Sequence, residues 1–406
     1  MKVLFVTQSI YPLSGGRSLA SYGYITEYQK HCDLTLASPV CGDAGLKDET
    51  RRFCESRGIK AFLVPATPNR AIFEKMREAS SRILAKLTMT VPVYHNLYRE
   101  ICDFIVENAV DLVIVDHIGM SLYFKKMHSK FPNVRFIYNA HNVEFRNTED
   151  ELITKAGSNP VKRLYARFRC RLRKKLEQYM IINSEHVFCI SRNDMAMLAK
   201  EFGYKEKYIF SKPLIQFPKT KSLDDVQEYH HKLMIVGSMN WYPNVKGIIW
   251  FVENVFKKLH EKDSELKLFL VGSKPTPEIK ALASENIIVT GFVDSTEPYF
   301  KECDISIIPV FEGTGAKIKV LESIARGIPT VCADFAAKDY DLSDAALMRG
   351  TTAEEFVEAI TVISKSSEIR KRLYEQMSKY YFDYFHLSCE VVDVISGENH
   401  KREHIK

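Results

Sequence analysis

The sequence predicts an α/β protein made of two Rossmann-like halves, and three observations support this fold class. Short apolar runs rich in β-branched residues alternate with longer stretches of helical periodicity, a pattern typical of βαβ units with parallel sheets. The alternation breaks once, in a polar stretch over residues 216–231, and then restarts. The length of 406 residues suits two or three domains of about 150 residues each.

The first half opens with a strand, a glycine turn and a helix. Residues 3–7 form a short apolar run, Gly15 and Gly16 supply the turn, and residues 19–29 place apolar side chains near one helical face. The run at residues 111–116 is apolar between two terminal aspartates, as expected for a strand buried on both faces. Further strands are expected at residues 34–37, 62–64, 136–138 and 187–190.

The second half repeats this pattern. Its expected strands lie at residues 233–237, 266–272, 286–291, 304–309 and 329–333. Three of them end in glycine, at Gly237, Gly272 and Gly291. A glycine at this position lets a ligand approach the backbone at the carboxyl edge of a sheet.

The pattern also predicts how the chain divides. We expect an N-terminal domain over residues 1–215, a linker over 216–231 and a second domain over 232–376. A helical segment at 377–396 is expected to pack back on the first domain, and the polar tail at 397–406 to be disordered. The sheets of the two domains are expected to face each other across a cleft that binds a ligand.

Composition excludes several classes of protein. No run approaches the ~18 apolar residues of a membrane span, and the first apolar run is too short for a signal peptide, so we expect a cytoplasmic protein. Nine cysteines, widely spaced and without a Cys-x-x-Cys pair, predict free thiols and no zinc site. The net charge of +6 permits an anionic ligand or a membrane surface without requiring either.

The most informative stretch runs from residue 309 to residue 323, after an expected buried strand. Small residues at 313–316 leave backbone N–H groups exposed where a helix begins, and the partial positive charge there favours an anion. Lys317 and Lys319 add full charges, and Glu322 lies further along the helix, where it can hydrogen-bond a sugar hydroxyl. These residues predict a site for a diphosphate and a ribose; the alternative is an ordinary strand–loop–helix with solvated lysines.

Residues 309–331 resemble the donor-site signature of glycosyltransferase family 4, which has the GT-B fold. Residues 139–144 (Asn-Ala-His-Asn-Val-Glu) are similar to the His-Asn-x-Glu segment of that family, and residues 236–247 to the opening of its second domain. The resemblance covers residues 1–385 in the family's order. It implies a GT-B enzyme that moves a sugar from a nucleotide-sugar donor to a saccharide hydroxyl, in surface polysaccharide or glycolipid biosynthesis.

The resemblance also implies roles for individual residues. His141 and Lys317 would be catalytic, and Gly15 and His117 would lie on the acceptor side. The donor would contact Gly16, Gly237, Ser238, Lys246, Gly291, Phe292, Val293, Thr314, Gly315, Ala316, Lys319 and Glu322. The family resemblance implies retention of anomeric configuration, no metal and no cofactor, since the nucleotide-sugar is a substrate.

Two positions depart from the family pattern. Thr314 stands where many relatives carry the first glutamate of Glu-x(7)-Glu, and Ser238 stands where many have an arginine. These departures keep open a non-catalytic polysaccharide-assembly protein with a degenerate donor site. A nucleotide-sugar epimerase on the same fold also stays open, because it would bind the same donor. A nicotinamide-dependent dehydrogenase is disfavoured because no Gly-x-Gly-x-x-Gly follows the first strand.

Residues 162–176 form a very basic segment in which Leu164, Phe168, Leu172 and Leu176 recur every four residues. Eight of the other eleven positions are lysines or arginines. Two interpretations stay open: a core-packed helix with a solvated basic face, and a helix that docks on anionic lipid, which suits a lipid-linked acceptor. Nucleic-acid binding is disfavoured because no recognition motif accompanies the segment.

Overall fold

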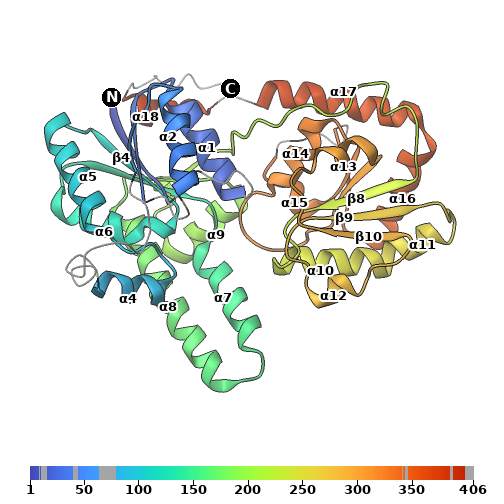
Figure 1. The fold of residues 1–406 in the computed structure, drawn as a ribbon, viewed down its shortest axis with the longest axis horizontal. Coiled ribbons are helices and arrows are strands. Elements are labelled where there is room, and N and C mark those ends of the chain that lie inside the picture. The colour runs from blue at the N-terminus through green and yellow to red at the C-terminus, as the bar shows by residue number, and fades with distance from the viewer. Residues whose placement is uncertain are drawn as a thin grey trace. The chain divides into compact units, whose positions relative to one another are not determined.

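The computed structural model describes residues 1–8, 10, 16–39, 44–63, 79–340, 342, 346–384 and 387–397. The chain forms two compact units, one of Met1–Ile215 with Leu387–Lys406 and the other of Gln216–His386. Each unit contains one parallel sheet with helices around it (Figure 1), so the predicted α/β class with two Rossmann-like halves is confirmed.

In the described part of the first unit, the sheet has seven strands in the order β3-β2-β1-β4-β5-β6-β7. Every neighbouring pair is parallel. The strand order reverses between β1 and β4, and ligands of open α/β sheets bind beside such a switch point, at the carboxyl ends of the strands. The strands are β1 (Lys2–Val6), β2 (Asp33–Ser38), β3 (Lys60–Leu63), β4 (Leu112–Asp116), β5 (Arg135–Ala140), β6 (His186–Cys189) and β7 (Tyr208–Phe210).

Helices connect these strands, and the pair α7 and α8 stands out as a long hairpin that projects from the sheet (Figure 1). Asn159 accepts a hydrogen bond from the Lys162 N–H group and so caps α8, and Pro160 occupies its first turn, where no N–H donor is needed. The described helices of this unit are α1 (Gly16–Tyr28), α2 (Ala44–Glu55), α4 (Ala79–Thr88), α5 (His95–Asn108), α6 (Ser121–Lys130), α7 (Glu144–Ala156), α8 (Pro160–Asn183), α9 (Arg192–Phe202) and α18 (Cys389–Ser396).

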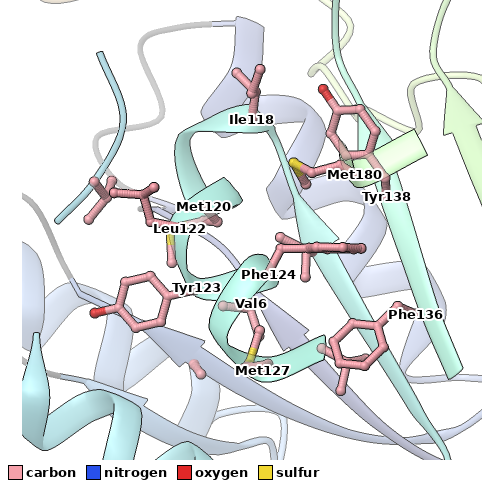
Figure 2. Close-up of a cluster of buried hydrophobic side chains, with 14 of the residues drawn as sticks. Val6, Ile118, Met120, Leu122, Tyr123, Phe124, Met127, Phe136, Tyr138 and Met180 are labelled. Atoms are coloured by element: carbon pink, nitrogen blue, oxygen red, sulfur yellow. The ribbon is translucent and has the colours of Figure 1, made fainter. Parts of the chain in front are cut away.

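A large cluster of buried apolar residues in the first unit lies between the sheet and the helices α5, α6 and α8. Figure 2 shows Phe124 and Met127 of α6 beside Val6 of β1 and Phe136 of β5, and all four side chains are buried. The rings of Phe124 and Phe136 meet edge to face with 5.3 Å between their centroids. Every residue of β4 is buried, which explains why its sequence is almost continuously apolar.

In the described part of the second unit, six parallel strands follow the order β10-β9-β8-β11-β12-β13. The switch point here lies between β8 and β11. The strands are β8 (Lys232–Val236), β9 (Lys267–Val271), β10 (Ile287–Gly291), β11 (Ile305–Ile308), β12 (Thr330–Ala333) and β13 (Met348–Gly350). The helices are α10 (Tyr242–Phe251), α11 (Lys257–His260), α12 (Pro277–Lys280), α13 (Glu297–Glu302), α14 (Ile318–Arg326), α15 (Asp334–Ala337), α16 (Ala353–Lys365) and α17 (Ser367–Tyr384).

Residues 216–231, which the sequence predicts to be a linker, belong to the second unit. The hydroxyl of Tyr381 accepts a hydrogen bond from the N–H group of Phe217 (2.7 Å) and donates one to its carbonyl (3.1 Å). Arg370 donates from Nε to the carbonyl of Val226 at 2.8 Å, and Val226 is buried. The polar composition of the stretch conceals these anchors, because they come from residues about 150 positions later.

The boundary between the two units near the end of the chain also differs from the expected one. The boundary expected at residue 377 falls inside α17, which continues to Tyr384. Only the segment from Leu387 onward, with α18, belongs to the first unit. Residues 398–406 of the expected tail lie outside the described residues.

Two whole-chain features can be checked on the described residues. Eight cysteines there are free thiols, as the sequence predicts for them. Among the described helices, none combines the length and the apolar character that a crossing of the bilayer requires.

Gly247 of α10 packs directly against the segment that follows β11, and we expect Gly247→Ala to destabilise the second unit. A Cβ atom at this position would lie 1.8 Å from the Pro309 carbonyl oxygen, so backbone would have to move, at a cost of about 2–3 kcal/mol. Gly291→Ala is the control: its φ of +71° is strained for alanine, but no atom lies within 4 Å of the new Cβ, so about 1 kcal/mol is expected. Urea unfolding measures both, and equal losses would contradict the packing argument.

Candidate functional site

The loop of residues 309–317, between β11 and α14, is built around glycines. Gly313 and Gly315 have φ values of +105° and +76°, a backbone region that side chains with a Cβ atom rarely adopt. A Cβ atom on Gly313 would also meet Trp241 and Pro243 at 3.2 and 3.1 Å, so α10 packs closely on this loop. The sequence therefore needs glycine at both positions to bring the loop against the start of α10.

Lys317 is buried inside this loop. Its ammonium donates to the carbonyl oxygens of Thr314 (3.1 Å) and Gly315 (2.6 Å), and the side chain lies 5.0 Å from the ring centre of Phe335. Only 5% of the residue is exposed. The structure thus brings Thr314, Gly315 and Lys317 together with the half-buried Ala316, and the charge of Lys317 holds the loop in shape from within.

Lys319, two residues later, belongs to α14, and its side chain reaches the end of β8. Its Nζ atom donates to Asn244 Oδ1 at 2.7 Å, and Asn244 in turn donates to the carbonyl of Ser238 at 2.8 Å. A Cβ atom on Gly237 would come within 2.8 Å of this Nζ atom. Burial and the nearby Lys317 ammonium lower the pKa of Lys319 to about 8.

Asn244 is the residue of this group that the sequence interpretation does not single out. It is buried at the start of α10 and connects Lys319 to Gly237 and Ser238. The signal for it is its place inside the stretch 236–247, but an asparagine there gives no hint of a bond to a lysine 75 positions away. Lys246, half a turn further on, is more exposed and pairs with Glu312 at 3.0 Å, which raises its pKa.

Glu322 and the loop after β10 form the other end of this group of residues. Glu322 accepts a hydrogen bond from Arg326 Nε at 3.1 Å and lies 3.5 Å from the hydroxyl of Thr296, which stands just before α13. Burial raises the pKa of Glu322, and Arg326 opposes that shift. In the same loop Gly291 has a positive φ, Phe292 is 71% exposed, and Val293 packs partly into the core.

In the first unit, Asp116 gathers hydrogen-bond donors at the switch point of the sheet. Its Oδ1 atom accepts from His141 Nε2 (2.7 Å) and Asn139 Nδ2 (2.6 Å). Its Oδ2 atom accepts from the hydroxyls of Thr7 (2.8 Å) and Ser21 (2.6 Å). Burial favours the neutral acid, but the His141 ring and these hydrogen bonds outweigh it and lower the pKa of Asp116 to about 2.

The two candidate histidines of this unit, His117 and His141, lie side by side. Their ring centres are 5.8 Å apart and the rings are nearly perpendicular. His141 is 2% exposed, and its Nδ1 atom has no hydrogen-bond partner among the described residues. His117 Nε2 lies 2.8 Å from Glu144 Oε1, at the start of α7.

The glycines predicted near this point are only partly described. Gly16 begins α1, the helix that supplies Ser21 to Asp116, whereas Gly15 lies outside the described residues. From the sequence, Asp116 is recognisable only as the end of a strand. A charged residue that closes an apolar strand at a switch point is the signal that could have identified it.

The basic segment forms the middle of α8, and its apolar stripe is divided. Leu164 and Phe168 are 70% and 49% exposed, whereas Leu172 and Leu176 are half-buried. The predicted stripe therefore packs inward only in the second half of the segment, while the first half packs through Ala166 instead. Within the described residues, no cluster of three or more His, Cys, Asp or Glu side chains is arranged to hold a metal ion.

We expect Asp116→Asn to destabilise the first unit by about 3 kcal/mol at pH 7, since the amide NH₂ would face groups that donate. The folded-state pKa lies below the ordinary 3.8, so this carboxylate stabilises the fold above about pH 4 and loses that effect as the pH falls toward 2. The gap between wild type and variant in free energy of unfolding should therefore narrow in that window. The exposed Asp111→Asn change is the control, with under about 1 kcal/mol expected; equal effects would contradict the role of Asp116.

Part of the second unit matches a known protein family. Residues 230–366 match the family model of Glycosyl transferases group 1, a range that contains every candidate donor residue of the second unit. No curated protein sequence matches the chain.

Solved structures of similar fold cover nearly the whole chain. Anabaena HepE, in complex with UDP and glucose, has 14% identity and a TM-score of 0.62, over 98% of both chains. A glycosyltransferase from Rickettsia africae has 13% identity and a TM-score of 0.62, over 97% of this chain and 98% of its own. WaaG, a glycosyltransferase involved in lipopolysaccharide biosynthesis, has 16% identity and a TM-score of 0.60, over 97% of this chain and 100% of its own. The chain therefore has the GT-B fold of these solved glycosyltransferases, and the match to Glycosyl transferases group 1 covers residues 230–366 of its second unit.

Proposed function

We propose that the chain transfers a sugar from a nucleoside-diphosphate sugar to a saccharide hydroxyl, with retention of configuration and without a metal ion or cofactor. The observation that carries this proposal is the pair of buried or half-buried ammonium groups, Lys317 and Lys319, at the carboxyl ends of β11 and β8. Negative charge grows on the diphosphate as the glycosidic bond breaks, and positive charge already in place stabilises it.

Within this proposal Lys319 carries the diphosphate contact and Lys317 shapes the loop whose amide groups face the same anion. Lys319 is held at the end of β8 by one asparagine, so its ammonium is oriented before the donor arrives. Lys246 of α10 adds a more exposed charge. Glu322 would bind the ribose, and Gly291, Phe292 and Val293 would lie against the base.

The first unit would supply the acceptor side and part of the sugar site. The buried Nδ1 atom of His141 has no partner among the described residues and would accept a hydrogen bond from a sugar hydroxyl. Gly16 would approach the donor, and Gly15 and His117 the acceptor. In the proposed retaining step the departing phosphate oxygen takes the proton of the acceptor hydroxyl as the new glycosidic bond forms, so no pair of catalytic carboxylates is needed.

Activity is tested with UDP-glucose and a panel of saccharide and lipid-linked acceptors, because HepE was solved with UDP-glucose. A glycosylated product with the anomeric configuration of the donor supports the proposal. Rearranged donor sugar without transfer would favour the epimerase instead. A chain that binds no nucleoside diphosphate and transfers no sugar would favour an assembly protein.

We expect Lys319→Met to weaken UDP binding about tenfold or more, because a charge-assisted contact is lost. The ammonium is charged below its pKa of about 8, so wild-type affinity should fall as the pH rises through 8, and the variant should lose this dependence. Calorimetric titration with UDP, GDP and ADP, each with and without EDTA, measures both effects, and Lys280→Met on an exposed lysine is the control. Binding that EDTA abolishes would contradict the metal-free site, and unchanged binding by Lys319→Met would contradict its role.

We also propose that the enzyme works at the inner face of a membrane and docks there through a surface that we call the α8 patch. It consists of exposed apolar side chains interleaved with exposed cations: Val161, Lys162, Arg163, Leu164, Tyr165, Arg167, Phe168 and Arg171. The neighbouring α4 adds Ile83 and Leu84, which are 65% and 38% exposed. Each cation near an anionic surface contributes about 1 kcal/mol of attraction, and the apolar side chains can insert.

Vesicle binding tests the α8 patch. Wild-type protein should sediment with phosphatidylglycerol vesicles, release at high salt, and bind phosphatidylcholine vesicles weakly. The double variant Leu164→Ser, Phe168→Ser should lose most of the binding. Phe382→Ser, on an exposed phenylalanine of α17 in the second unit, is the matched control and should bind like wild type. Equal loss in both variants, or no binding by wild type, would rule out this surface.

A further inference from the structure

A series of buried polar contacts connects the end of α4 to the two histidines of the first unit. Arg173 of α8 lies at its centre and is only 5% exposed. Its Nη1 atom donates to the carbonyl oxygens of Thr88 (2.6 Å) and Met89 (2.8 Å), which close α4. Its Nη2 atom donates to Glu144 Oε2 at 2.9 Å. One guanidinium group therefore ties α4, α8 and the first residue of α7 together.

Glu144 connects Arg173 to His117, because each of its carboxylate oxygens has its own hydrogen-bond partners. While one carboxylate oxygen accepts from Arg173, the other accepts from Asn142 Nδ2 (2.9 Å) and His117 Nε2 (2.8 Å). The other ring nitrogen of His117, Nδ1, accepts from the Gly119 N–H group at 3.0 Å. In the neutral ring the proton must then reside on Nε2, directed at Glu144.

His117 needs such anchoring because its backbone is strained. Its φ is +68°, in a region that a histidine seldom adopts, and it stands between β4 and the short 3-10 helix Ile118–Met120. Bonds at both ring nitrogens hold the side chain, and its edge-to-face contact places it against His141. The carboxylate of Glu144 thus determines how the His117 ring is presented.

The groups that face Glu144 keep it charged. Burial opposes its charge, but His117 and Arg173 hold the pKa of Glu144 well below its usual range. Glu177, also on α8, accepts hydrogen bonds from the N–H groups of Glu144 and Phe145, and burial together with the Glu144 charge raises its pKa to about 8. Tyr138 of β5 completes the surroundings, 3.5 Å from Glu177.

We propose that Arg173 is a positioning residue for the transfer reaction: it holds Glu144 against His117 and so fixes the His117 ring beside His141. This inference rests on the proposed function of the two histidines in sugar transfer. Arg173 acts only through Glu144 and touches no substrate. Its replacement should change acceptor turnover and leave nucleotide binding in the second unit intact.

A matched control for Arg173 lies one turn earlier on α8. Arg169 also donates to carbonyl oxygens at the end of α4, from Nε to Leu87 (2.9 Å) and from Nη2 to Lys86 (3.0 Å). It is not among the partners of Glu144 in the described structure. Arg169→Met therefore removes the same kind of helix cap without disturbing the histidines, and it separates a general loss of stability from a loss of positioning.

The experiment compares wild type, Arg173→Met, Arg173→Lys and Arg169→Met with a soluble acceptor. Arg173→Met should lower kcat/KM for the acceptor about tenfold or more, keep the Kd for UDP within about twofold, and move the acid limb of the pH profile upward, because Glu144 would protonate more easily. Arg173→Lys keeps a charge beside Glu144 and should recover part of the rate and of the pH profile. Arg169→Met should retain the wild-type pH profile.

A second readout does not depend on transfer. In ¹⁵N-histidine spectra the wild-type His117 should be the Nε2–H tautomer, and both Arg173→Met and Glu144→Gln should alter its titration, whereas Arg169→Met should not. The proposal is overturned if Arg173→Met and Arg169→Met behave alike in both measurements, or if His117 carries its proton on Nδ1. If wild type transfers no sugar, the proposed function fails, and the spectra still decide whether Arg173 positions His117.

Discussion

The hydrogen bonds to the Asp116 carboxylate hold together the carboxyl edge of the sheet in the first unit, where the candidate histidines lie. This carboxylate is fully buried, and its four hydrogen bonds come from the end of β1, from α1, from β5 and from the loop that carries His141. A buried charge is tolerated only when its hydrogen-bonding capacity is filled. Those four elements therefore have to meet at this point, and His141 takes its orientation from the same requirement.

The charged groups near the switch points of the two sheets have opposite signs. In the first, a carboxylate is buried and surrounded by donors, so hydrogen bonds within the protein stabilise the negative charge. In the second, the Lys317 ammonium donates to two carbonyl oxygens of its loop and the Lys319 ammonium to the Asn244 amide oxygen, and burial together with the Lys317 charge lowers the pKa of Lys319. Like charges brought together in this way are costly, and an anionic ligand relieves that cost.

Local patterns made much of the fold predictable from the sequence. The apolar run ending at Asp116 and the glycines at the ends of β8 and β10 identify strands because each pattern lies within a few residues. The edge strands β7 and β13 were not expected, since each has only three residues and pairs along one side. The contacts that hold residues 216–231 to the second unit could not be predicted, because their partners Tyr381 and Arg370 are remote in sequence.

For the candidate site residues too, contacts between residues that are distant in sequence could not be predicted. The stretch 309–323 could be chosen from its glycines and lysines, but the division of labour between Lys317 and Lys319 depends on distant contacts, Asn244 among them. Within the basic segment all eight cations look alike in sequence, yet Arg173 is buried and Arg171 exposed. Only the packing of α8 against α4 and α7 distinguishes them.

The return of α18 to the first unit has a consequence for synthesis. That unit is assembled from both ends of the sequence, with the whole of Gln216–His386 inserted between its parts. A ribosome releases Met1–Ile215 long before Cys389–Ser396 exists, and domains generally fold as their residues emerge. The first unit must therefore persist without its closing helix while the second unit is made, and it reaches its final form only after the second unit has been translated.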